Sequence, residues 1–175
     1  CVMLNPCSMS VAGETPVWRD MLQLGGLSGF VGCLLAACIM DVETKLVYRY
    51  VWIAAFVPLL ILFWTADKSP SQAGWTELMI FTLLQQVLFS HVYGRADSHA
   101  FCVCAMAFTI FGGGFAECVV HMAISFLLLC IIQVYRKNVT VKGKLKVPVA
   151  MVPYITVGFC AYMMMWKWVD FTVRK

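Results

Sequence analysis

The chain has 175 residues, of which 62% are hydrophobic and 13% are charged, and its formal net charge is +4. A typical soluble domain is roughly 45–50% apolar and about 25% charged, so this composition, with its mean hydropathy of +0.83, favours a membrane protein. Because a helix needs about 20 residues to cross a bilayer, the chain has room for six spans and for no separate soluble domain of ordinary size. A Rossmann domain, a nucleic-acid enzyme and a secreted disulfide scaffold are therefore excluded.

The predicted elements begin with a polar, irregular lead over residues 1–20, which lacks the basic segment and following apolar stretch of a signal peptide. Six apolar runs follow, and each is a predicted membrane-spanning helix. They cover residues 21–40, 50–66, 75–93, 100–111, 115–135 and 147–168. The sequence thus predicts an all-α, polytopic membrane domain with six transmembrane helices over residues 21–168, and a C-terminal tail over residues 169–175.

Glycines mark two places in this pattern. Gly25, Gly26, Gly29 and Gly32 give the first run a small-residue face, which is typical of close helix packing in membranes. A further run of three glycines, at 112–114, separates the fourth run from the fifth. We therefore expect a tight contact along the first helix and a sharp turn after the fourth.

The distribution of basic residues predicts the orientation of the chain. The first, third and fifth loops carry eight Lys or Arg residues, whereas the second and fourth loops carry only Lys68. The N- and C-terminal tails lie on the same side as the even loops, and counting their Lys and Arg residues changes the comparison to eight against five. Cytoplasmic loops are enriched in Lys and Arg. The odd loops are therefore expected in the cytoplasm and both termini outside.

Carboxylates at the ends of the spans are the candidate functional groups, because a charge at the edge of the hydrocarbon core is costly unless it is paired or solvated. Asp41 lies at the exit of the first predicted span, and Asp97 lies at the entrance of the fourth. Alternating spans place both on the cytoplasmic side at similar depth, which favours a functional pair. The competing interpretation is two solvated loop aspartates.

The residues after Asp41 form the first of three motifs. Thr44 and Lys45 follow at the third and fourth positions after the aspartate, and Val47-Tyr48 follows at the sixth and seventh. This stretch resembles the first motif of the type IV prepilin peptidases, a family of aspartic membrane proteases, which has Thr, a basic residue and Ile-Pro at those positions. Tyr48 in place of proline loosens a turn that proline would make rigid.

The second and third motifs come later in the chain. Gly94-Arg95-Ala96-Asp97 looks like the GxGD motif of the same family, with Ala96 at the position of the second glycine. Val147-Pro148, then Pro153-Tyr154-Ile155 and Gly158, are similar to the late Ile-Pro and Pro-Phe-Leu…Gly stretch of the family. The Cβ of Ala96 restricts the backbone more than glycine does. We expect this smallest substitution to be tolerated, with an attenuated enzyme as the alternative.

The resemblance, which covers about residues 21–168, implies a peptidase that removes the basic leader of prepilins and prepilin-like proteins at the cytoplasmic membrane face. Cleavage in this family follows a glycine that precedes a hydrophobic helix. Many members also carry a methyltransferase domain with paired C-x-x-C motifs. Only a few residues separate Asp41 from the second run, so the chain resembles the short, peptidase-only form associated with Flp/Tad-type pili.

The site that the resemblance implies is an aspartyl dyad that needs neither a metal nor a cofactor. Its catalytic residues are Asp41 and Asp97, and the motif-supporting residues are Thr44, Lys45, Gly94, Ala96, Pro148 and Pro153. Two close carboxyl groups share one proton and titrate as a pair, so one can activate a water while the other polarises the scissile carbonyl. The implied partners are membrane-embedded prepilin-like substrates and the bilayer, and Glu43 is either an attraction for the basic leader or a solvated loop residue.

Other readings of the sequence compete with this one. Gly26-Leu27-Ser28-Gly29 matches the GxSG string of rhomboid serine proteases, but here the serine lies in the first span and His121 in the fifth, and a packing face explains the glycines better. Cys102-Val103-Cys104 lacks the spacing of a zinc site and is expected to pack as small apolar side chains. A small transporter, or an inactive homologue that binds pilins or assembly proteins, remains as an alternative function.

Overall fold

The structure, a computed structural model, describes residues 17–66, 69–139 and 150–173, and describes side chains as far as residue 135 in the fifth helix and residue 166 in the sixth. All regular structure in these residues is helical. The elements are α1 (Val17–Thr44), α2 (Arg49–Thr65), α3 (Gln72–Val87), a 3-10 turn η1 (Phe89–His91), α4 (Arg95–Ile110), α5 (Phe115–Val139) and α6 (Val152–Val173). The prediction of an all-α fold with six helices is confirmed.

The helix bounds differ from the predicted runs at both ends of the chain. Residues 17–20 were expected to be irregular but belong to α1, and residues 169–173, expected in the tail, belong to α6. The early start of α1 has a clear physical reason, because the Arg19 guanidinium donates to the carbonyl oxygens of Thr65 (3.0 Å) and Ala66 (2.5 Å) at the end of α2. Those carbonyls have no partner within their own helix.

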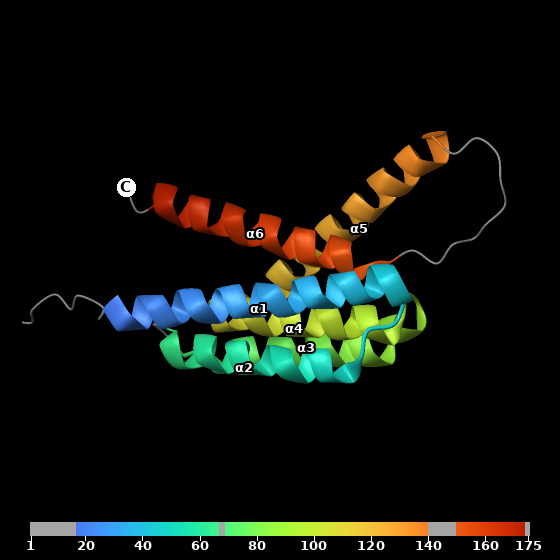
Figure 1. The fold of residues 1–175 in the computed structure, drawn as a ribbon. Helices are drawn as coiled ribbons and strands as arrows, with labels where there is room; N and C mark the ends of the chain where they lie inside the picture. The colour runs from blue at the N-terminus through green and yellow to red at the C-terminus, as the bar shows by residue number, and fades with distance from the viewer. Residues whose placement is uncertain (1–16, 67–68, 140–149, 174–175) are drawn as a thin grey trace, which may run out of the picture.

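Successive helices run in alternating directions, as Figure 1 shows. The end of α1, the η1 turn after α3, and the starts of α2, α4 and α6 therefore lie at one end of the bundle, which we call the site end. The start of α1 and the end of α6 lie at the opposite end. Helix α5 leans away from the other helices toward its C-terminus (Figure 1).

Helix α4 is the central helix of the bundle, because it contacts α2, α3, α5 and α6. Its Phe108 packs against the rings of Phe159 (centroids 5.1 Å apart) and His121 (5.2 Å), and all three side chains are almost fully buried. Edge and tilted contacts of this kind are favourable arrangements for aromatic rings. A helix enclosed in this way presents little surface to the surroundings.

Two of the four glycines in α1 lie where α1 approaches α2. A Cβ on Gly26 would lie 3.1 Å from the side chain of Leu62, and one on Gly29 would lie 3.4 Å from Pro58, whereas Gly25 and Gly32 face open space. Only two of the four glycines in the predicted small-residue face therefore lie against α2. At the end of α4, Gly112 has a φ of +88°, a conformation that favours glycine, so the expected sharp turn is present.

Among the residues that the structure describes, two helices are long and apolar enough to cross a membrane, Val17–Thr44 and Phe115–Tyr135, while Arg49–Thr65 and Val152–Trp166 are shorter apolar helices. The six-span arrangement thus stays a prediction. The outward side chains are nevertheless strongly apolar. Leu24, Ile53, Leu83, Ile131 and Met164 are each more than half exposed, at 69%, 67%, 65%, 55% and 74%.

Candidate active site

Asp41 lies in the last turn of α1 and is 8% exposed. Its Oδ2 accepts a hydrogen bond of 3.1 Å from the backbone N–H of Val152, the first residue of α6, which is 111 residues away in sequence. The start of a helix carries unpaired N–H groups and a partial positive charge, both of which stabilise a carboxylate. The bond therefore fixes the Asp41 carboxyl group against the start of α6.

Thr44 and Lys45 shape the turn that ends α1. The Thr44 hydroxyl donates to the carbonyl of Met40 (2.8 Å) and accepts from the N–H of Leu46 (3.2 Å), while Lys45 adopts a φ of +57° and its N–H donates to the carbonyl of Asp41 (3.2 Å). Both side chains are exposed. The structure thus gives these two motif residues a role in ending the helix at Thr44, three residues after Asp41.

Asp97 lies in the first turn of α4, three residues after the N-cap residue Gly94. Gly94 has a φ of +117° and a ψ of 155°, a combination that only glycine adopts without strain. A Cβ there would lie 3.5 Å from Oδ2 of Asp97, an ordinary contact distance, so the requirement for glycine comes from the backbone conformation. The first glycine of the motif is therefore required by the backbone that leads into Asp97.

Ala96 has no such requirement. It is the second residue of α4, and among the residues that the structure describes Lys45 is the only non-glycine residue with a positive φ. Alanine is the most favourable residue inside a helix. The backbone at this position accepts alanine without strain, which agrees with the expectation that the substitution is tolerated.

A buried polar cluster holds the segment before Asp97 in place. The Ser98 hydroxyl, fully buried, donates to the carbonyl of Gln85 (2.6 Å) at the end of α3, and the Tyr93 hydroxyl donates to the side-chain oxygen of the same glutamine. The Tyr93 ring also packs against Phe101 and Phe126, each at a centroid distance of 5.7 Å. Neither Tyr93 nor Ser98 was predicted from the sequence as a site residue, although both are polar and lie directly beside the second motif in an apolar region.

The two aspartates act on each other electrostatically. Asp97 precedes the apolar run of residues 100–111, and its burial, with a smaller contribution from the negative charge of Asp41, raises the pKa of its carboxyl group to about 7. No hydrogen bond joins the two carboxyl groups in the described part of the chain. At neutral pH the site therefore holds an Asp97 that is close to half protonated, near a second carboxyl group.

The third motif contributes the start of α6. Pro153 is the second residue of that helix, where the missing N–H of proline removes no helical hydrogen bond. Pro148 lies outside the described residues, and Glu43 is exposed near the end of α1. Of the implied site, the structure therefore places Asp41, Asp97 and the first turn of α6 at the site end.

The competing sites are not assembled. Ser28 is exposed and bonds to the Gly25 carbonyl of its own helix, whereas His121 is buried and its Nε2 lies 3.0 Å from the carbonyl oxygen of Ile155. Cys104 is fully buried in the core, and Cys102 accepts a hydrogen bond from Gln86. Across residues 17–66, 69–139 and 150–173, no three His, Cys, Asp or Glu side chains form a group that could hold a metal ion.

Comparison with known proteins gives no independent assignment. No protein-family model, no curated protein and no solved structure matches the chain.

Proposed function

We propose that this protein is a six-span aspartic endopeptidase of the type IV prepilin peptidase kind, in the short form without a methyltransferase domain. One observation carries the proposal: the three stretches that resemble family motifs meet at the site end. Asp41 of the first motif bonds to the N–H of Val152, directly before Pro153 of the third. The charge of Asp41 acts on Asp97 of the second motif. If Asp41 and Asp97 were two unrelated solvated aspartates, we would not expect both to lie at the same end of the bundle as the start of α6.

The apolar surface supports the membrane location. Soluble monomers rarely expose large continuous apolar patches, yet bulky apolar side chains are exposed on α1, α2, α3, α5 and α6. Helix α4 has 16 residues, about 24 Å in length, which is short of a hydrocarbon core of about 30 Å. This short helix is compatible with the proposal because four other helices contact α4, so that less of its surface faces lipid.

The charges support the orientation. Lys45, Arg49 and Arg95 all lie at the site end, and five more Lys or Arg residues occur in sequence between positions 136 and 146, from the end of α5 toward the start of α6. The proposal therefore places the site end at the cytoplasmic face and both termini outside the cell.

The chemistry follows from two carboxyl groups that share one proton. The ionised group removes a proton from a water molecule, and the protonated group donates a hydrogen bond to the scissile carbonyl and then protonates the leaving amine. The raised pKa of Asp97 keeps a proton available at neutral pH. The substrate is a prepilin-like precursor whose apolar helix lies in the bilayer, so that its leader junction meets the site end.

Co-expression with a prepilin that has a glycine at its leader junction tests the proposal, with leader removal scored by gel shift. We expect cleavage by the natural sequence, and none by the Asp41→Asn or Asp97→Asn variant. Asp20→Asn is the matched control, because Asp20 is an exposed aspartate at the start of α1, at the opposite end of the bundle. Cleavage that persists in both site variants contradicts the proposal. Prepilin binding without cleavage by the natural sequence favours the inactive homologue instead.

A further inference from the structure

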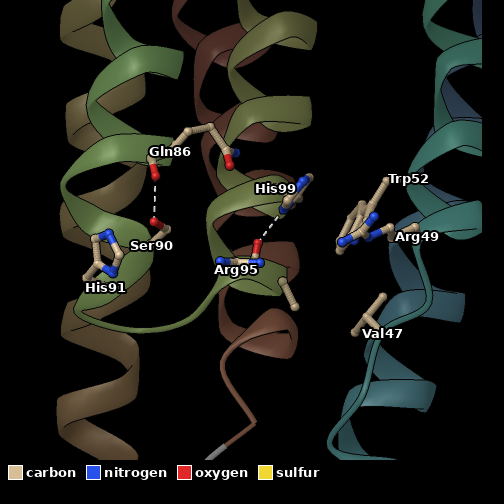
Figure 2. A pocket seen from close by; sticks show the side chains of 9 residues that line it. Val47, Arg49, Trp52, Gln86, Ser90, His91, Arg95 and His99 are labelled. Carbon is tan, nitrogen blue, oxygen red and sulfur yellow. Dashed lines mark hydrogen bonds between the residues drawn. The ribbon is translucent and has the colours of Figure 1, made fainter.

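A cavity of about 420 Å³ opens at the site end between the start of α2 and the start of α4. Figure 2 shows Arg49 and Trp52 on one wall and Arg95 and His99 on the facing wall, with His91 contributed by the η1 turn. The cavity also includes Ala96, the residue before Asp97, so it lies next to the candidate active site.

The lining of this cavity is basic. It includes two guanidinium groups and two imidazoles, and none of its lining residues is Asp or Glu. Among the described residues, no carboxylate forms an ion pair with Arg49 or Arg95, although the His99 ring bonds to the backbone carbonyl of Arg95. Guanidinium groups bind phosphate oxygens with paired, charge-assisted hydrogen bonds. The cavity therefore has the chemistry of a site for a phosphate group.

The basic cavity continues into apolar hollows along the same two helices. A hollow of about 140 Å³ shares Trp52 and His99 with it, and a further hollow of about 170 Å³ shares Phe56 and Met106 with the first hollow. Because α2 and α4 both start at the site end, the path follows the two helices in parallel. It runs from His99 to Ile110 on α4, eleven residues or about 16 Å.

We propose that this path binds one anionic phospholipid, with its phosphate at Arg49 and Arg95 and one acyl chain along the apolar hollows. A free phosphate ion would leave the hollows empty, and a helix about 10–12 Å in diameter is too wide for hollows of about 140 and 170 Å³. Trp52 lies where the basic and apolar parts meet, a position that suits tryptophan at a membrane interface. The inference requires the chain to lie in a membrane but does not depend on peptide cleavage.

Native mass spectrometry of the full chain in a neutral detergent tests whether the site prefers an anionic lipid headgroup. We expect one phosphatidylglycerol to remain bound at concentrations where phosphatidylcholine does not, and the double variant Arg49→Gln/Arg95→Gln to weaken this binding about tenfold or more. Lys45→Gln is the matched control, because Lys45 is a cation of the site end that does not line the cavity. Equal phosphatidylglycerol binding by the double variant and the natural sequence overturns the proposal.

A second pair of variants distinguishes a lipid from a free phosphate ion. Met106→Trp fills the junction of the two hollows, whereas Met164→Trp places the same ring at an exposed position of α6. We expect Met106→Trp to weaken phosphatidylglycerol binding while Met164→Trp does not, with helix content checked by circular dichroism. If inorganic phosphate displaces the lipid at equal concentration, the site is one for free phosphate and the proposal is wrong. If Met106→Trp leaves lipid binding unchanged, no acyl chain lies in the hollows and the proposal is wrong as well.

Discussion

The two ends of the bundle differ in how their carboxyl groups are arranged. At the end away from the site, Glu77 accepts a hydrogen bond from the N–H of Phe115 (2.6 Å), and Glu117 accepts one from the N–H of Gly114 (2.8 Å). Both glutamates thus satisfy the start of α5. At the site end, Asp41 accepts one backbone hydrogen bond at the start of α6, and Asp97 lies inside the first turn of α4.

The difference shows how a capping carboxylate can be told from one suited to acid–base chemistry. Glu77 and Glu117 each have a donor within 2.8 Å, and the two bind neighbouring N–H groups of one turn. Asp41 instead lies in the last turn of α1 and Asp97 in the first turn of α4, and burial has raised the pKa of Asp97 to about 7. A carboxyl group whose pKa is close to the working pH is a good general acid or base.

The largest expected effect is a loss of cleavage that is confined to the site end. Asp41→Asn or Asp97→Asn should lower the rate at least about a hundredfold, because each removes an acid–base group. Glu117→Gln and Glu77→Gln should leave the rate within about twofold and lower the free energy of unfolding by about 1 kcal/mol through a weaker cap. Leader removal and thermal unfolding, measured on the same preparations, make the comparison. If the glutamate variants lost as much cleavage as the aspartate variants, the proposed difference between capping and catalytic carboxyl groups would be wrong.

The next effect is on the pH dependence of stability. The pKa of Asp97 is about 7 in the folded chain, against about 3.9 for an unfolded aspartate, so between these values the folded state binds more protons. Stability should therefore fall as pH rises from about 4 to about 7, by about 1.4 kcal/mol for each pKa unit of difference.

Thermal unfolding in detergent across this pH range measures the slope. Asp97→Asn should flatten it, because asparagine does not titrate. An identical slope in the Asp97→Asn variant would show that another group is responsible.

The sequence predicts the helices of this protein better than it predicts how they meet. Apolar runs and a glycine turn identify all six helices, because a helix end depends on local chemistry. The hydrogen bond from Val152 to Asp41 joins segments 111 residues apart, and no local pattern encodes it. Only the resemblance to a family brought the two segments together. The positions of Tyr93 and Ser98 around Gln85 were missed because burial and partner are properties of the packed bundle.

A smaller effect concerns the two positions of the Gly94-Arg95-Ala96-Asp97 motif that the family occupies with glycine. Gly94→Ala forces a φ of +117° on a residue with a Cβ and should lower the free energy of unfolding by about 1–3 kcal/mol, with reduced cleavage. Ala96→Gly restores the family motif in a helical position and should cost only about 0.5–1 kcal/mol. Denaturant unfolding and leader removal measure both. A larger loss from Ala96→Gly than from Gly94→Ala would contradict the backbone argument.

A further small effect tests the contact that positions α6, and with it the N–H of Val152 that binds Asp41. A Cβ on Gly158 would lie 2.7 Å from Oγ of Ser125 in α5, so Gly158→Ala should lower the free energy of unfolding by about 1 kcal/mol or slightly more. Removing that oxygen with Ser125→Ala leaves only contacts of 3.5 Å and longer around the new methyl group. The double variant should therefore be more stable than the sum of the two single changes predicts, as a double-mutant cycle measures. Additive losses would mean that α5 and α6 approach each other less closely than the 2.7 Å contact requires.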